Sequence, residues 1–153
     1  MNQHRYLDDF AVGETFISGG ITFTESDIID FAMNFDPQPF HLDTEAAAHS
    51  LYGGLIASGL HTVSVCFRLF IQGGLLAKCS MGSPGIDEMR WLVPVRPGDT
   101  LHSKVEVIEV KPSSKRPDRG ILRLKYAAIN QHGETVSSFI VNHLVKRSIS
   151  TTS

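Results

Sequence analysis

The first half of the chain places hydrophobic residues at helical spacing. After Thr24, a common capping residue, apolar side chains recur every three or four positions and predict a helix that stops at Asp36, before a proline. A short second helix is predicted over 44–48. Between about 58 and 77, apolar residues fill nearly every helical face, so this helix must be buried on most sides. We expect it to be the central helix, weakened in its last turn by Gly73-Gly74.

The second half of the chain shows the pattern of β-strands. Segments rich in β-branched and aromatic residues, separated by turn residues, predict strands over 89–95, 105–110, 121–126 and 136–144, and another is expected around 15–23. Pro97-Gly98 fits a type II turn, and residues 111–120 form a polar loop. Several antiparallel strands with one deeply buried helix predict an α+β fold in which a curved sheet wraps around that helix.

Composition narrows the class of protein. Of 153 residues, 42% are hydrophobic and 20% are charged, which is typical of a globular protein and argues against disordered, collagen-like and coiled-coil chains. This length favours one domain, which we expect over residues 1–147. The Ser- and Thr-rich residues 148–153 are expected to form a flexible C-terminal tail.

Charge, hydropathy and cysteine content limit the expected partners and location. Fourteen Lys and Arg against sixteen Asp and Glu give a net charge of -2, which argues against nucleic-acid binding. The first nine residues lack an export signal, and the uncharged segment 46–67 is too interrupted by Gly and His to span a membrane. Cys66 and Cys79 lie among hydrophobic residues, which favours reduced, buried thiols in a cytoplasmic protein.

The densest polar cluster runs from Asp36 to Asp43. In it, His41 follows two prolines and precedes the predicted second helix. If this segment were fully extended, Asp36 and His41 would lie on the order of 15 Å apart. If the chain turns between them, the carboxylate and a neutral imidazole can transfer protons through one water molecule. The residues alone leave open the alternative that Asp36 ends a helix and His41 covers a loop.

A second candidate element is the start of the buried helix, around Ser58 and Gly59. Free backbone N–H groups at a helix N-terminus can polarise a carbonyl oxygen on which negative charge develops. Gly59 would let a ligand approach the backbone closely. Because nearly every helix has such an end, this feature is a weak signal by itself.

Residues 36–43, 54–60 and 94–99 together resemble the MaoC-like dehydratases, which include the R-specific enoyl-CoA hydratases (hydratase 2). The resemblance covers nearly the whole chain and implies a hot-dog fold, normally assembled as a homodimer or larger. The family motif is roughly Gly-Asp-x-Asn-Pro-hydrophobic-His, followed six positions later by a small residue. Asp36 and His41 fall on its catalytic Asp and His, Pro39 on its Pro, and Ala47 on the small residue.

Three positions depart from the family pattern. Phe35 replaces the Gly before the Asp, Gln38 replaces the Asn that helps to orient the site, and Ser58 stands where many members have His. Gln38 can still donate an amide hydrogen bond, but from a longer side chain. Phe35 and Phe40 could narrow or reshape the acyl pocket.

The resemblance implies a hydro-lyase that adds water across the double bond of a trans-2-enoyl-CoA to give an (R)-3-hydroxyacyl-CoA. Asp36 and His41 would activate the water, and Gln38 would hold the water or a catalytic side chain. Backbone N–H groups near Ser58 and Gly59 would take the charge of the thioester oxygen. No metal or cofactor is expected beyond the coenzyme A of the substrate, and the histidines show no metal-ligand spacing.

A basic cluster and two rival functions complete the expectations. Lys115, Arg116 and Arg119 lie in one loop and either meet the phosphates of coenzyme A or form a solvated hairpin tip. The rival functions are an acyl-CoA thioesterase of the same fold and an inactive acyl-CoA-binding subunit. A lone unit of this fold leaves a sheet edge that usually needs a partner, so a homo-oligomer is expected.

Overall fold

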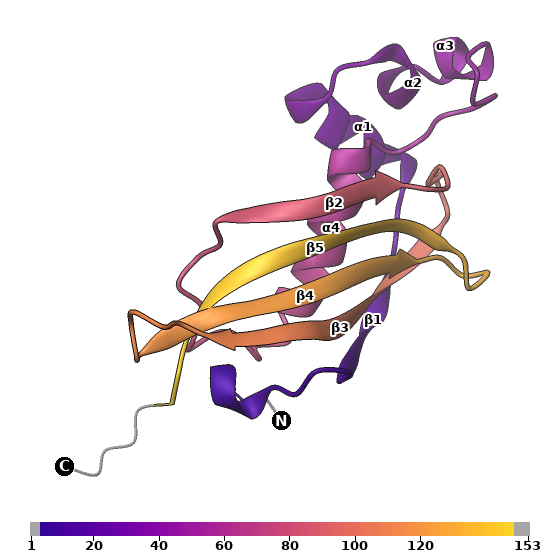
Figure 1. Cartoon of the computed structure of the whole chain (residues 1–153). Helices are drawn as coiled ribbons and strands as arrows, with labels where there is room; N and C mark the ends of the chain where they lie inside the picture. The colour runs from indigo at the N-terminus through magenta and orange to yellow at the C-terminus, as the bar shows by residue number, and fades with distance from the viewer. Residues whose placement is uncertain (1–3, 149–153) are drawn as a thin grey trace.

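The computed structural model describes residues 4–148 and consists of one antiparallel sheet and a few helices (Figure 1). In chain order the elements are a 3-10 turn η1 (Leu7–Asp9), β1 (Thr15–Thr22), α1 (Glu25–Phe35), α2 (Pro39–Leu42), α3 (Thr44–Ala48), α4 (Gly59–Ile71), β2 (Gly85–Trp91), β3 (Thr100–Pro112), β4 (Arg119–Ile129) and β5 (Thr135–Lys146). The short helices α2 and α3 lie beyond one end of α4, together with α1 (Figure 1).

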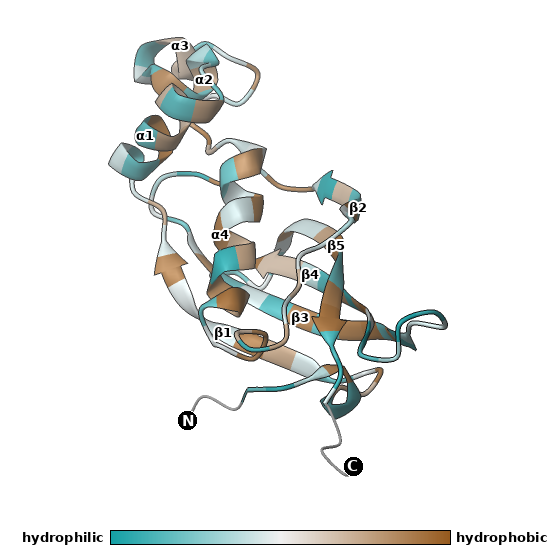
Figure 2. Cartoon of the chain, turned by 90° about the vertical axis from the view of Figure 1, so that its left-hand side faces the viewer, coloured by the Kyte–Doolittle hydropathy of each residue, from teal (hydrophilic) through white to brown (hydrophobic). Residues whose placement is uncertain are grey.

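The sheet has the strand order β1-β3-β4-β5-β2, and every neighbouring pair is antiparallel. Residues alternate between buried and more exposed along β3 and β4, so one face of the sheet is apolar. Helix α4 packs on that face, against β1, β3, β4 and β5 (Figure 2). The predicted α+β architecture, a curved antiparallel sheet around a central helix, is confirmed.

The predicted helix boundaries are confirmed at α1 and corrected at α4. The Thr24 side chain accepts a hydrogen bond from the Asp27 N–H at 3.1 Å, and α1 ends at Phe35 as expected. Helix α4 ends at Ile71, six residues before the predicted limit of 77. Gly74 has a φ of 85°, a value that a right-handed helix cannot accommodate. The apolar residues that follow it, up to the predicted limit of 77, lie in turns.

The strand predicted over 89–95 is displaced. Strand β2 begins earlier, at Gly85, and ends at Trp91. Beyond Trp91, the N–H groups of Leu92 and Val93 both donate to the carbonyl oxygen of Val136, so regular pairing stops there. Pro94 follows and has no N–H to continue the ladder. The turn prediction holds, because Gly98 has a φ of 92° and the Asp99 N–H donates to the Arg96 carbonyl at 3.0 Å.

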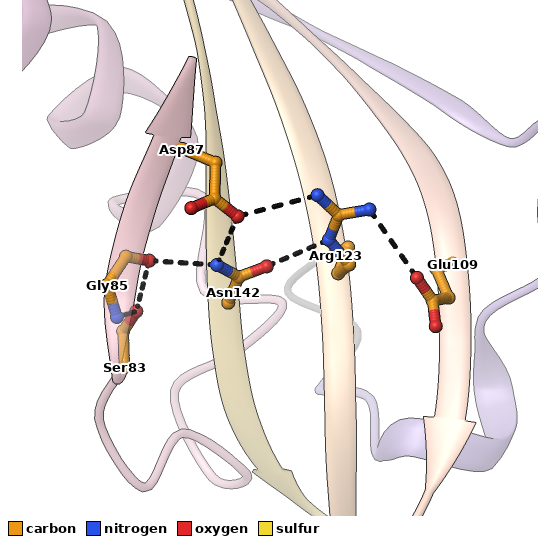
Figure 3. Close-up of polar contacts among 6 residues, drawn as sticks. All are labelled: Ser83, Gly85, Asp87, Glu109, Arg123 and Asn142. Atoms are coloured by element: carbon orange, nitrogen blue, oxygen red, sulfur yellow. Dashed lines mark hydrogen bonds and ion pairs between the residues drawn. The ribbon is translucent and has the colours of Figure 1, made fainter. Parts of the chain in front are cut away.

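Polar side chains connect four strands on the face of the sheet that points away from α4 (Figure 3). Nε of Arg123 in β4 donates to the side-chain oxygen Oδ1 of Asn142 at 2.9 Å, and the side-chain amide of Asn142 donates to Asp87 at 2.8 Å. The same guanidinium lies 3.5 Å from carboxylate oxygens of both Asp87 and Glu109. We call Asp87, Glu109, Arg123 and Asn142 the outer-face network; it ties the edge strand β2 to β5, β4 and β3.

Both cysteines are free and buried, as predicted, and Cys66 Sγ lies 3.3 Å from Ser103 Oγ. Asp8 contacts the first residue of the predicted tail, Ser148. The N–H and the hydroxyl of Ser148 each donate a hydrogen bond to the Asp8 carboxylate at 3.2 Å. The rest of that tail lies outside the described residues. Within the range 4–148, none of the helices is long and apolar enough to cross a lipid bilayer.

Candidate active site

The chain folds back between α1 and α2. Asp36 caps the C-terminus of α1, and its carbonyl accepts a hydrogen bond from the Gln38 N–H at 2.8 Å across Pro37. Pro39 then starts α2 at the first helical position, where its missing N–H costs nothing. The His41 N–H donates to the Gln38 carbonyl at 2.9 Å and closes this single turn of helix. The sequence did not indicate α2, and it left open whether the chain turns at this point.

This turn brings the carboxylate and the imidazole together. Nε2 of His41 lies 3.3 Å from Oδ2 of Asp36, and the two side chains are 5% and 18% exposed. Of the two arrangements that the residues alone left open, the structure therefore has the convergent one. Two groups at this distance can share one water molecule or one proton.

A backbone carbonyl fixes the orientation and tautomer of His41. Nδ1 of His41 lies 2.7 Å from the carbonyl oxygen of Ile56. Because a carbonyl oxygen only accepts, Nδ1 must carry a hydrogen and act as the donor. In the neutral imidazole, the lone pair is therefore on Nε2, the nitrogen that faces Asp36.

Two side chains donate hydrogen bonds to the Asp36 carboxylate. The Gln38 amide donates to Oδ1 at 2.6 Å, and the Ser58 hydroxyl donates to Oδ2 at 2.7 Å. Burial acts to raise the pKa of Asp36, but the hydrogen bonds from Gln38 and Ser58 and the positive charge of His41 when it is protonated outweigh it, so the pKa lies below its usual value. Asp36 is therefore a carboxylate at neutral pH. The departure from Asn to Gln at position 38 keeps a donor on this group.

Ser58 connects the carboxylate to the central helix. It is fully buried and caps α4, since its hydroxyl oxygen accepts a hydrogen bond from the Leu60 N–H at 3.2 Å while donating to Asp36. The sequence singled out its backbone rather than its hydroxyl. A serine directly before a glycine-initiated helix was the available signal for capping, but no local pattern indicated its bond to a residue 22 positions away.

The N–H of Gly59, the first residue of α4, has no acceptor within residues 4–148. The Trp91 ring lies directly over Gly59, at a place where a β-carbon would overlap its atoms. Both residues line the same cavity as Asp36 and His41. The arrangement of a free N–H, a carboxylate and an imidazole around one space fits the prediction for Gly59.

That cavity has a volume of about 650 Å³, and most of its lining residues are apolar. It is lined by Asp36, Gln38, Phe40, His41, Tyr52, Ile56, Ala57, Gly59, Leu60, Thr62, Trp91, Leu92, Val93, Pro94, Val95 and Val136. Hydrogen bonds from the Ile56 N–H to the Phe40 carbonyl and from the Ala57 N–H to the Val95 carbonyl hold the segments of the wall together. An apolar cavity with a few converging polar groups is the usual form of a small-molecule site.

The family model described as the MaoC like domain matches residues 9–125. The chain belongs to the MaoC-like dehydratase family. A MaoC-like dehydratase from Rhodospirillum rubrum has a solved structure that is 43% identical, with a TM-score of 0.88, and the match covers 95% of this chain and 99% of that one. The hot-dog fold implied by the sequence resemblance is thereby confirmed.

Two curated relatives of this MaoC-like chain are informative. An uncharacterized protein, YdeM, of Bacillus subtilis is 34% identical over 141 residues, which cover 92% of this chain and 99% of the relative. A 3-hydroxybutyryl-CoA dehydratase of Methylorubrum extorquens is 34% identical over 113 residues, which cover 72% of this chain and 69% of the relative. The family thus includes a protein named for the dehydration of an acyl-CoA.

The two phenylalanines of the MaoC-like motif region differ in position. Phe40 lines the cavity, and its ring centroid lies 4.6 Å from that of His41. Phe35 is exposed and packs on Phe31 at 5.0 Å, and it does not line the cavity. Of the two expected changes to the pocket, the structure therefore supports only the one at Phe40.

The structure does not bring the basic loop to the cavity within this chain. Lys115 and Arg116 lie in the β3–β4 hairpin and Arg119 begins β4, at the end of the sheet away from α2 (Figure 1). Arg119 is paired with the neighbouring Asp118, with 2.9 Å between Nε and Oδ1. Their contact with coenzyme A stays a prediction, and in the single chain it has no geometric support.

Proposed function

We propose that this MaoC-like protein is a hydro-lyase that adds water to a trans-2-enoyl thioester, or removes it from a 3-hydroxyacyl thioester. The observation that carries the proposal is the 3.3 Å convergence of Asp36 and His41 on the wall of an apolar cavity, beside the free N–H of Gly59. The name of the Methylorubrum relative supports an acyl-CoA as the substrate.

The water molecule is held by two acceptors. The neutral His41 offers the lone pair of Nε2 and Asp36 offers a carboxylate oxygen, so one water can donate a hydrogen to each. Its oxygen lone pairs then point into the cavity, toward the β carbon of the bound enoyl group. Gln38 and Ser58 hold the carboxylate in this position.

The addition then proceeds with balanced proton transfer. The low pKa of Asp36 makes its carboxylate a weak acceptor, so His41 Nε2 takes one proton as the water oxygen bonds to the β carbon. The electron pair of the double bond moves to the thioester oxygen, which accepts a hydrogen bond from the Gly59 N–H. The imidazolium then returns its proton to the α carbon on the same face. The reaction regenerates both side chains and needs no further cofactor, because the thioester acidifies the α carbon.

Crotonyl-CoA is the first substrate to test, with loss of the enoyl absorbance and appearance of free thiol measured in the same sample. The proposal expects the absorbance to fall without release of thiol, and His41→Gln to abolish the change. Thiol release with an intact double bond would instead identify the thioesterase. Binding of acyl-CoA without turnover at any chain length would identify the inactive binding subunit.

We also propose that the protein works as a homo-oligomer. Within residues 4–148, strand β2 lies at the edge of the sheet and pairs only with β5, which leaves its other edge open. Exposed apolar side chains lie on or near this strand: Ile86, Trp91, Leu92 and, at the start of α4, Leu60. Light scattering after size-exclusion chromatography tests this, and a monomer at micromolar concentration would contradict it.

A further inference from the structure

An exposed arginine lies directly beside the wall of the active-site cavity. Arg96 follows Val95, which lines the cavity and whose carbonyl accepts a hydrogen bond from the Ala57 N–H at 2.8 Å. Ala57 in turn precedes Gly59 by two residues. Arg96 is therefore close to the proposed thioester site in space, although the two are 37 positions apart in sequence.

The Arg96 side chain is held in one position. Its Nη2 donates to the carbonyl oxygen of Tyr52, another lining residue, at 2.6 Å. Its Nη1 lies over Gly54, where a β-carbon would approach it to 3.2 Å, so the absence of a side chain there makes room for the guanidinium. The Arg96 N–H donates to the Asp99 carboxylate at 2.8 Å and fixes the backbone at the start of the Pro97-Gly98 turn.

The charge of this guanidinium is not neutralised by a carboxylate within residues 4–148. Four other arginines have such a partner in an ion pair: Arg5, Arg119, Arg123 and Arg147. Arg68, Arg90 and Arg116 have none. The side chains of Arg68 and Arg90 bind Gln72 and Met89, which do not line the cavity, and Arg116 lies in the β3–β4 hairpin and does not line it either. Arg96 alone among the described arginines combines an unpaired charge with a bond to the cavity wall. A fixed guanidinium with unused N–H donors suits a phosphate group.

We infer that Arg96 binds a phosphate on the arm that carries the acyl group. The inference rests on the proposed function, since it assumes an acyl thioester with its reacting carbons between His41 and Gly59. The apolar cavity then holds the acyl chain, and the polar arm must leave it toward solvent. Coenzyme A and acyl carrier protein both attach their acyl group through a phosphopantetheine arm, so a phosphate is the chemistry that they share.

The test compares three crotonyl thioesters that differ in their phosphates: those of N-acetylcysteamine, phosphopantetheine and coenzyme A. The variant is Arg96→Gln, which removes the charge and keeps a polar amide at this position, and Arg90→Gln is the matched control on an exposed arginine. We expect Arg96→Gln to lower the ratio of kcat/KM for the coenzyme A ester to that for the N-acetylcysteamine ester roughly tenfold, mainly through KM, because a charged hydrogen bond to phosphate is lost. Arg90→Gln should leave this ratio unchanged.

The three esters also distinguish the phosphates. If the phosphopantetheine ester loses as much as the coenzyme A ester, Arg96 binds the phosphate shared with carrier proteins; if only the coenzyme A ester loses, it binds a phosphate of the nucleotide. Equal losses with all three esters would mean that Arg96 only holds the backbone at Tyr52 in place, and they would overturn the inference. A loss in a Lys115→Ala/Arg116→Ala variant but not in Arg96→Gln would overturn it in favour of the hairpin.

Failure of the proposed function is distinguishable from failure of this inference. If the wild type converts none of the three esters, calorimetric titration with coenzyme A itself replaces the kinetics. Weaker binding to Arg96→Gln than to Arg90→Gln supports the phosphate contact even then, and equal affinity contradicts it.

Discussion

The Asp36–His41 pair and the outer-face network both join acidic side chains to nitrogen-bearing partners, yet only one of them is placed for chemistry. In the pair, the side chains are 5% and 18% exposed and line a cavity. In the outer-face network, Arg123 is 31% exposed and its carboxylate partners are 51% and 42% exposed (Figure 3). None of the outer-face network residues lines the cavity beside Asp36 and His41.

Burial and position on the cavity wall, rather than the number of charges, distinguish the two clusters. Exposed ion pairs are screened by water and contribute about 0–1 kcal/mol to stability. A carboxylate and an imidazole that are mostly buried on a cavity wall keep strong hydrogen bonds and can pass a proton to or from a bound molecule. We therefore expect substitutions in the pair to change activity and substitutions in the outer-face network to change stability slightly.

The largest effect is expected from Asp36→Asn, which keeps the shape of the side chain and removes its charge. The water then loses a charged acceptor, and the imidazolium formed during addition loses its counter-ion, so kcat/KM for crotonyl-CoA should fall by about 10²–10⁴-fold. The control is Asp87→Asn in the outer-face network, for which we expect activity within about twofold of the wild type. Equal losses in the two variants would remove the distinction between the clusters.

A smaller effect is expected from Gly59→Ala. The added β-carbon would overlap the Trp91 ring, which must then move within the cavity beside the Gly59 N–H. Steady-state kinetics should show a fall in kcat/KM of roughly tenfold or more, because a donor to the thioester oxygen is displaced or covered. The control is Gly85→Ala, at a position on the same strand as Trp91 where a β-carbon meets open space. Its kcat/KM should stay close to the wild-type value. Partial recovery of kcat/KM in the double variant Gly59→Ala/Trp91→Ala would show that overlap with the Trp91 ring causes the loss.

Ser58→Ala should shift the pH dependence of activity. The Ser58 hydroxyl is one of the donors that lower the pKa of Asp36, so its removal raises that pKa toward its ordinary value. Asp36 then takes up a proton at a higher pH, and the acid limb of the pH profile of kcat/KM moves to higher pH. The lost helix cap also costs about 1 kcal/mol of unfolding free energy. The control is the exposed variant Ser64→Ala, whose pH profile should match the wild type. If the acid limb of Ser58→Ala also matches the wild type, this role of Ser58 is contradicted.

The smallest effect is expected from Arg123→Met in the outer-face network. Removal of an exposed guanidinium should lower the free energy of unfolding by about 1 kcal/mol or less, as measured by urea denaturation. Turnover of crotonyl-CoA should stay at the wild-type level. A severe loss of activity would mean that the anchoring of β2 controls the position of Trp91, and the outer-face network would then belong to the active site.

The fold was predictable wherever local chemistry decides the structure. The Thr24 cap, the proline after Asp36 and the Pro97-Gly98 turn each act on their own neighbours, and the structure has all three. The end of α4 and the position of β2 were predicted wrongly. Apolar residues beyond Ile71 continue a helical pattern but pack in turns, and β2 is set by its pairing with the distant strand β5.

The site was predictable in its residue types but not in its contacts. The family pattern indicated Asp36, His41 and Gln38, whereas the turn that joins them depends on the one-turn helix α2. The bond from Ser58 to Asp36 and the bond from His41 to the Ile56 carbonyl join residues 22 and 15 positions apart. Such contacts follow from tertiary packing, which hydrophobic spacing does not encode.

The most direct test of a single water-activating pair is the geometry of addition. Hydration of crotonyl-CoA in deuterium oxide places deuterium on the α carbon and the hydroxyl group on the β carbon, and proton coupling constants give their relative configuration. If Asp36 and His41 supply both the water and the returning proton from one side of the cavity, as we propose, the addition is syn. Anti addition, or deuterium on both faces of the α carbon at early times, would contradict it.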